Sequence, residues 1–351
     1  FVLENLQFFY DRKKENSFIE LDERKINYKI LAKKEGLCAL CFLKRTFEIY
    51  LEKEVEAAAF KDFSFPSTAE VACSDFKEKA KDLPEFKEYE DKFFSVIEKC
   101  GRDKRFDYLK IKSLPKLNLE KTFEGSWWFI ENLTEKKFSD DLGVKIDAKS
   151  LEELKDLLKK IYDKKKKPLP YYAIIYLDGD NMGKWLSGEL LPEIQYAYNS
   201  EVWKNLPDNF KSHLTKFAPK KILTPAIHSA ISTALRNYAI EFVRKIVEEE
   251  YLGKLIYAGG DDVLAFVNLR GLFDVMEKLR WAFSGHIRIE NNEIKVDINN
   301  TSGFVLKDGI YYLTMGKHAT CSMGVVIAHY KEPLKVVIDK VFEMEKRAKN
   351  V

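Results

Sequence analysis

The chain contains 351 residues, of which 46% are hydrophobic and 13% aromatic, a composition that indicates a globular protein of about two domains. Its formal net charge of +3 is too small to indicate nucleic-acid binding by itself. No apolar run is long enough to cross a bilayer, no secretory signal is visible, and the five cysteines are an odd number, so the sequence predicts a cytoplasmic protein without membrane contact or a disulfide framework.

Two cysteines near the start of the chain have the spacing of a zinc motif. Cys38 and Cys41 form a Cys-x-x-Cys, which is half of a tetrahedral zinc site. Cys73 and Cys100 are isolated in helical patterns and supply no matching pair. The alternative to a zinc site is that Cys38 and Cys41 are two buried free thiols. The chain begins at Phe1 rather than methionine, which suggests a piece of a longer protein, and a partner pair could lie upstream.

The first half of the chain is predicted to be mostly helical. Helical signals run from residue 65 to about residue 100, with Ser67 as N-cap and Glu70 three residues later, a capping box. The pair Trp127-Trp128 could stack on bases, but such pairs more often belong to a core or an interface. A further helix is predicted over residues 150–162.

A run of lysines before two prolines marks the predicted domain boundary. Residues 164–167 are all lysine, and Pro168 and Pro170 follow them, a pattern typical of a solvated linker. We therefore expect a mostly helical domain over residues 1–165 and a second domain over residues 166–351.

The most strand-like run of the chain ends in an acidic turn. Residues 171–177 are continuously apolar, as in a central strand covered on both faces, and Asp178-Gly179-Asp180 follow. An EF-hand loop is rejected because its fifth position would be Met182 and because a strand precedes it where a helix is required. A P-loop is excluded because the glycine spacing is wrong.

A second acidic turn lies between two short runs of β-formers, residues 255–258 and 263–267. The turn is Gly259-Gly260-Asp261-Asp262, which predicts a tight hairpin. The glycines permit positive φ and close approach to the backbone, and the aspartates place two carboxylates at the tip. A surface hairpin built from ordinary turn residues remains the alternative.

The order of the elements from residue 171 onwards predicts the fold. Beyond the two turns described above, the sequence predicts a helix from Thr224 to about Tyr251, a helix over 271–283, hairpins around Asn291-Asn292 and Asp308-Gly309, a strand over 319–329 and a helix over 333–350. His228 and Arg236 lie on the long helix and are expected not to be catalytic. Stripped of insertions, this order is the ferredoxin-like βαββαβ plan of an α+β domain, with one further helix.

That plan places the two acidic turns at one edge of the sheet. Up to four carboxylates would then converge, and they repel one another unless cations lie among them. Such hard oxygen ligands suit Mg²⁺ or Mn²⁺, with substrate phosphates completing the coordination. Two ions about 3.5–4 Å apart can activate an attacking hydroxyl and stabilise a departing pyrophosphate.

The two acidic motifs, together with the helix segment 228–239, closely resemble the large palm-domain subunit of type III CRISPR effector complexes, most of all the Cmr (III-B) branch. Segments 65–70 and 37–45 are similar to the same family, so the resemblance touches most of the chain. It implies a palm fold related to GGDEF cyclases and polymerases, ATP binding, and synthesis of cyclic oligoadenylate when target RNA is recognised. It also implies other Cmr-type subunits as partners, one of them docking beside the palm, and guide and target RNA held through the complex.

The resemblance also assigns roles to particular residues. Catalytic and metal-holding positions match Asp178, Asp261 and Asp262, with Asp180 a further metal ligand. Nucleotide-binding positions match the turn glycines Gly179, Gly259 and Gly260 together with Asp180, the strand residues Ser322 and Gly324, and the helix lysines Lys346 and Lys349. For the two lysines, a solvated helix face is the alternative.

The chain departs from the family pattern in three ways. No His-Asp dipeptide occurs, so we expect no nuclease domain and no DNA cleavage by this chain. One Cys-x-x-Cys stands where the family has two. Because the sequence stops just after the palm, we expect the usual C-terminal helical domain to be missing. With the acidic motifs, the resemblance implies a nucleotidyltransferase-type palm acting on ATP. A scaffold subunit that binds the nucleotide without turning it over is the alternative.

Overall fold

The computed structural model describes residue 43 and residues 65–100, 110–111, 114–119 and 122–350. The chain divides into two compact units, Phe1–Tyr171 and Tyr172–Val351. The boundary predicted after residue 165 lies at the end of a helix, a few residues before this division. Cys38 and Cys41 lie outside the described residues, so the zinc motif stays a prediction.

The described part of the first unit is mostly helical. Its elements are α2 (Thr68–Ala80), α3 (Pro84–Cys100), β1 (Lys110–Ile111), β2 (Thr122–Phe123), the 3₁₀ turns η3 (Gly125–Trp128) and η4 (Ile130–Asn132), α4 (Glu135–Leu142) and α5 (Ala148–Lys165). The predicted N-cap is confirmed, because the Ser67 hydroxyl accepts a hydrogen bond from the Glu70 amide at 3.0 Å.

An aromatic core holds this first unit together. Trp127 and Trp128 are only 3% and 0% exposed. Trp128 stacks on Phe86 and on Phe123, with ring centroids 4.4 and 5.0 Å apart. These tryptophans are therefore core residues, and the base-stacking interpretation is wrong because no face of either ring is open.

A four-stranded sheet forms the centre of the second unit. The strands are β3 (Tyr171–Gly179), β4 (Gly253–Ala258), β5 (Val263–Asn268) and β10 (Cys321–His329), and their order across the sheet is β10-β3-β5-β4. β5 pairs antiparallel with both β3 and β4. This arrangement, with the fourth strand beside the first and the third beside the second, confirms the predicted ferredoxin-like plan.

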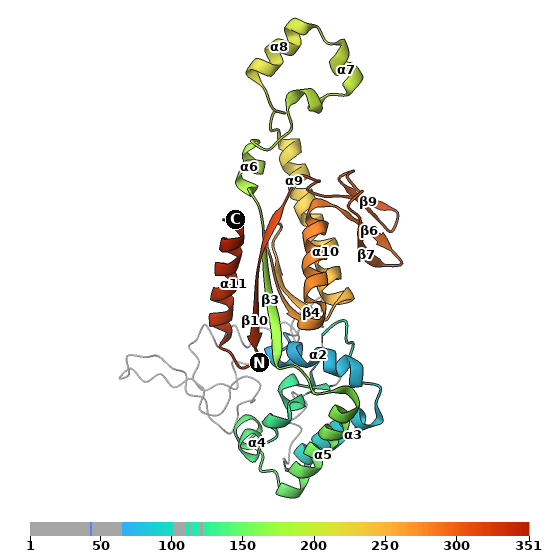
Figure 1. Ribbon diagram of the computed structural model, residues 1–351, viewed down its shortest axis with the longest axis vertical. Coiled ribbons are helices and arrows are strands. Elements are labelled where there is room, and N and C mark those ends of the chain that lie inside the picture. Colours follow the sequence, from blue (N-terminus) through green and yellow to red (C-terminus); the bar gives the residue numbers. More distant parts are fainter. Residues whose placement is uncertain (1–42, 44–64, 101–109, 112–113, 120–121, 351) are drawn as a thin grey trace, which may run out of the picture. The chain divides into compact units, whose positions relative to one another are not determined.

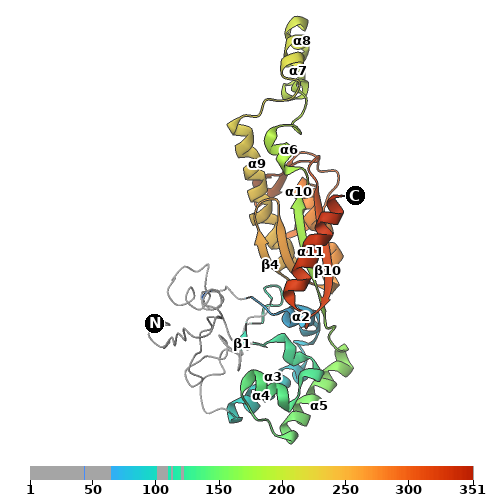
Figure 2. The same ribbon diagram turned by 90° about the vertical axis from the view of Figure 1, so that its left-hand side faces the viewer.

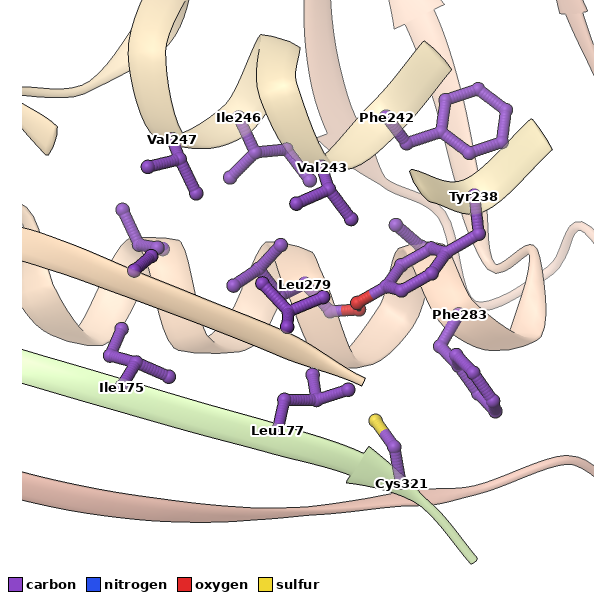
Figure 3. Close-up of a cluster of buried hydrophobic side chains, with 14 of the residues drawn as sticks. Ile175, Leu177, Tyr238, Phe242, Val243, Ile246, Val247, Leu279, Phe283 and Cys321 are labelled. Atoms are coloured by element: carbon purple, nitrogen blue, oxygen red, sulfur yellow. The ribbon is translucent and has the colours of Figure 1, made fainter. Parts of the chain in front are cut away.

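Helices cover both faces of this sheet (Figure 1). α9 (Pro225–Asn237) begins at the predicted Thr224 cap and continues through wider π-helical turns to Glu250, and α10 (Leu272–Ser284) packs beside it. Figure 3 shows the core between these helices and the sheet, with side chains from β3, the π-helical continuation of α9, α10 and β10. α11 (Leu334–Lys349) packs against β10 on the other face, where Phe342 meets the Tyr176 ring at 4.6 Å.

Two insertions interrupt the plan. Between β3 and α9 lie α6 (Met182–Ser187), η5 (Ile194–Ala197), α7 (Ser200–Asn205) and α8 (Asp208–Phe217), beyond the end of the sheet at which β3 ends (Figures 1 and 2). Between α10 and β10 lie the hairpins β6–β7 (Ile287–Glu290, Glu293–Val296) and β8–β9 (Phe304–Lys307, Ile310–Leu313). Both hairpins turn where predicted, since Asn291, Asn292, Asp308 and Gly309 all have positive φ.

No helix in the described ranges is both long and apolar enough to pass through a lipid bilayer.

Candidate metal and nucleotide site

The two acidic turns meet at one edge of the sheet. The last pair of the β3–β5 register joins Leu177 to Val263, so Asp178 and Asp262 are the next opposed positions along the two chains. Cβ atoms at opposed positions of antiparallel strands are about 5 Å apart. The Gly179 amide also donates a hydrogen bond to the Asp261 carbonyl oxygen at 3.0 Å. The structure thus brings the turns together, as the ferredoxin-like plan predicts.

The hairpin tip has a conformation that glycine makes accessible. The Gly259 amide donates a hydrogen bond to the Asp262 carbonyl oxygen at 3.0 Å and closes the turn. Gly260 has a φ of +100°, in the left-handed region that side chains disfavour. The turn therefore presents Asp261 and Asp262 together at the edge of the sheet.

The Asp262 carboxylate is held by a neighbouring tyrosine. The Tyr257 hydroxyl donates a hydrogen bond to it. Partial burial and the adjacent charge of Asp261 raise the pKa of Asp262, whereas hydrogen bonds from its own backbone and from Tyr257 act in the opposite direction. The negative charge of Asp262 in turn raises the pKa of Tyr257. Two adjacent carboxylates that repel each other in this way would be stabilised by a cation.

The carboxylate of the other turn is paired with a lysine from α11. The Lys349 ammonium contacts Asp178 and lies 3.0 Å from Glu345 Oε1, in a charge contact without hydrogen-bond geometry. Glu345 is buried, and this burial is the main reason that its pKa is raised. Burial lowers the pKa of Lys349. A positive charge supplied by the protein itself therefore already lies against Asp178.

Asp180 is hydrogen-bonded to residues at the start of β10. The Ser322 hydroxyl donates a hydrogen bond to Asp180 Oδ1 at 2.7 Å, and the Asp180 amide donates one to the Thr320 carbonyl oxygen at 2.9 Å. The structure thus joins two residues, Asp180 and Ser322, that the sequence assigned to the site separately. Their contacts with metal and nucleotide stay predictions.

Gly324 lies beneath α11. A Cβ atom at this position would lie 2.3 Å from the Val341 carbonyl oxygen and 2.4 Å from the Glu345 amide nitrogen. Its lack of a side chain therefore lets the helix approach the strand closely. Its predicted contact with a nucleotide stays a prediction, and so does that of Lys346, which is exposed on the last turns of α11.

The donor set fits divalent cations, although no metal site is fully assembled. Within the ranges that the structure describes, no three His, Cys, Asp or Glu side chains gather closely enough to hold an ion. Asp178 instead contacts Lys349, and Asp180 accepts a hydrogen bond from Ser322. Mg²⁺ is usually bound by one or two carboxylates together with substrate phosphates, so a fully assembled protein cage is not required. Asp178, Asp261 and Asp262 can supply those carboxylates once Lys349 moves from Asp178.

Sequence reasoning missed two residues of this site. Tyr257 stands in a strand pattern that gives it no distinctive signal, and Glu345 has the appearance of a solvated helix residue. The spacing of Glu345 and Lys349, four residues apart on one helix, was the available signal that they form a pair. His228 and Arg236 are exposed on α9.

Comparisons with known proteins show the family and the fold of this chain. Residues 171–351 match the family model for Cas10/Cmr2, second palm domain. A relative from Pyrococcus furiosus, named CRISPR system Cmr subunit Cmr2, is 30% identical over 318 residues, which are 90% of this chain and 31% of the relative. The chain therefore spans less than a third of the length of that relative.

Two solved structures share the fold. The cryo-EM structure of type III-B Cmr-beta in the apo state gives a TM-score of 0.51 at 21% identity, over 92% of this chain and 38% of the matched chain. The same assembly bound to cognate target RNA gives a TM-score of 0.53 at 19% identity, over 95% of this chain and 39% of the matched chain.

Proposed function

The chain belongs to the Cas10/Cmr2 family, whose second palm domain it contains, and from this premise we propose that it is the nucleotide-binding palm of a CRISPR RNA-guided RNA-silencing complex. The observation that carries the proposal is the hydrogen bond from the Gly179 amide to the Asp261 carbonyl oxygen, which joins the two acidic turns. ATP with Mg²⁺ or Mn²⁺ is the ligand that such a carboxylate pair suits.

The proposed reaction joins ATP molecules into a cyclic oligoadenylate. The ribose hydroxyl of one ATP attacks the α-phosphate of another, and pyrophosphate leaves. Bound divalent cations would lower the pKa of the attacking hydroxyl and neutralise the charge of the triphosphate. Asp178, Asp261 and Asp262 would hold these cations at the sheet edge.

The remaining residues of the site would position the nucleotide. Lys349, when it leaves Asp178, and Lys346 on the same helix end would offer ammonium groups to the triphosphate. The backbone at Gly179, Gly259 and Gly260 leaves room for phosphate or ribose to approach closely. Positioning and charge neutralisation of this kind supply most of the catalysis in phosphoryl transfer.

The proposed partners are other Cmr-type subunits, with guide RNA and target RNA held by the assembly. The support is that relatives carry the name Cmr2 and that one matched structure is an assembly bound to target RNA. A zinc ion at Cys38 and Cys41 remains part of the proposal for the N-terminal segment.

A nucleotide-binding scaffold without turnover is the second candidate. The contact of Lys349 with Asp178 favours it, because a site neutralised by its own lysine is stable without metal. Both candidates require ATP to bind at the same carboxylates, so binding is the property to test first.

Binding is tested by calorimetric titration of the purified chain with ATP in the presence of Mn²⁺. We expect the wild type to bind ATP with Mn²⁺. Asp261→Asn plus Asp262→Asn should lower the affinity at least about tenfold, because the two replacements remove negative charge that attracts the cation. The matched control is Asp308→Asn in the β8–β9 turn, where asparagine suits the positive φ and affinity should not change. Equal affinity in all three proteins would contradict the proposal.

A further inference from the structure

β4 contains an extra residue just before the hairpin. Leu255 pairs with Ala265, but the next paired residue of β4 is Tyr257, opposite Leu264, so that Ile256 is passed over as a bulge. Side chains alternate between the two faces of a strand. In a regular strand, Tyr257 would share the core face with Leu255. The bulge turns it to the opposite face, and bulges commonly re-aim side chains in this way beside active sites.

On that face Tyr257 reaches the acidic turn. Its hydroxyl donates the hydrogen bond to the Asp262 carboxylate described above. The side chain is 50% exposed, so burial in the core does not account for its position. The bulge and the hydrogen bond together indicate that this tyrosine orients the Asp262 carboxylate.

The first glycine of the turn is explained by the same contact. Of the two glycines, only Gly260 has a left-handed φ, so the backbone at Gly259 would accept any residue. A Cβ atom at Gly259, however, would lie 1.7 Å from the Tyr257 hydroxyl oxygen and 2.2 Å from Cζ of the same ring. It would also lie 2.8 Å from Asp262 Oδ1. Gly259 is thus the position where a side chain would expel the tyrosine from the carboxylate.

We propose that Tyr257 is a positioning residue that holds the Asp262 carboxylate ready for a divalent cation, and that Gly259 must be glycine to make room for it. This role rests on the proposed metal-dependent function. A carboxylate fixed by a hydroxyl on one side keeps one orientation, so the cation does not have to restrict its rotation. Loss of such a partner commonly weakens metal binding by about 10–100-fold.

The test is the Mn²⁺ affinity of the purified chain, measured by the electron paramagnetic resonance signal of free Mn²⁺. Tyr257→Phe keeps the ring and removes the hydroxyl, and we expect the dissociation constant to rise about tenfold at an unchanged melting temperature. The matched control is Tyr311→Phe on β9, which removes the hydroxyl of another exposed tyrosine of the same unit. This control should bind Mn²⁺ like the wild type.

A double-mutant cycle separates the contact from a general effect of the glycine. Gly259→Ala should weaken Mn²⁺ binding in the wild-type background, because the added methyl group displaces the Tyr257 ring. In the Tyr257→Ala background there is no ring to displace, so the same change should cost much less. Such non-additivity is expected of residues that act through one contact.

The outcomes distinguish this inference from the proposed function. If the wild type binds Mn²⁺, Asp261→Asn abolishes binding and Tyr257→Phe has no effect, the positioning role is wrong and the metal site stands. Equal losses in Tyr257→Phe and Tyr311→Phe would also overturn the role. If the wild type binds no Mn²⁺, the metal-dependent function fails and the role of Tyr257 fails with it.

Discussion

Oligoadenylate synthesis is expected to stop when the hairpin carboxylates are neutralised. With the assembled complex, labelled ATP, Mn²⁺ and target RNA, Asp261→Asn plus Asp262→Asn should lower the rate of product formation by at least about 100-fold. Electrostatic stabilisation of the transition state typically contributes this much or more. The physical reason is that cations held by these side chains would neutralise the triphosphate charge in the transition state.

Asp308→Asn in the same complex is the matched control, since it removes one exposed carboxylate of the same domain and should leave the rate unchanged. Three results are informative. Product in the wild type and the control alone supports the enzyme. ATP binding without product in any of the three proteins supports the scaffold. Equal amounts of product from the wild type, the double variant and the control contradict a role for these aspartates.

A methyl group on Gly324 is expected to destabilise the second unit strongly. The Cβ atom would overlap the Val341 carbonyl oxygen and the Glu345 amide nitrogen of α11. Backbone atoms cannot move aside without displacing the helix, so Gly324→Ala should lower the free energy of unfolding by about 3 kcal/mol. Urea denaturation of the purified chain measures this loss.

Gly183→Ala provides the control for this prediction. Gly183 lies in α6, and its added Cβ would have no atom within 4 Å. Because alanine is the better helix former by about 1 kcal/mol, this variant should be as stable as the wild type or slightly more so. Unchanged stability in Gly324→Ala would mean that α11 does not pack on β10 as closely as the structure shows.

The order of the strands was predictable because the sequence marks each one clearly. The continuous apolar run over residues 171–177 indicated a central strand, and β3 is paired with β5 on one side and β10 on the other. Glycine and aspartate at Gly260 and Asp261 located the hairpin. Once the ferredoxin-like order was adopted, the proximity of Asp178 and the hairpin followed from topology alone.

Contacts between distant side chains were not predictable in the same way. Lys349 and Asp178 are 171 residues apart, and no local pattern pairs them. The bulge that turns Tyr257 towards Asp262 is hidden because Leu255, Ile256 and Tyr257 all favour strands. The lysine was expected at phosphates and is found at a carboxylate, which becomes visible only when the helix is placed against the sheet.

The position of bound Mn²⁺ tests the account most directly. In crystals of the chain grown with Mn²⁺ and ATP, anomalous scattering locates each ion without reference to activity. We expect ions about 2.1 Å from carboxylate oxygens of Asp178 and of Asp261 or Asp262, with Lys349 moved from Asp178 towards the triphosphate. Mn²⁺ and triphosphate bound elsewhere, with Lys349 still on Asp178, would contradict it.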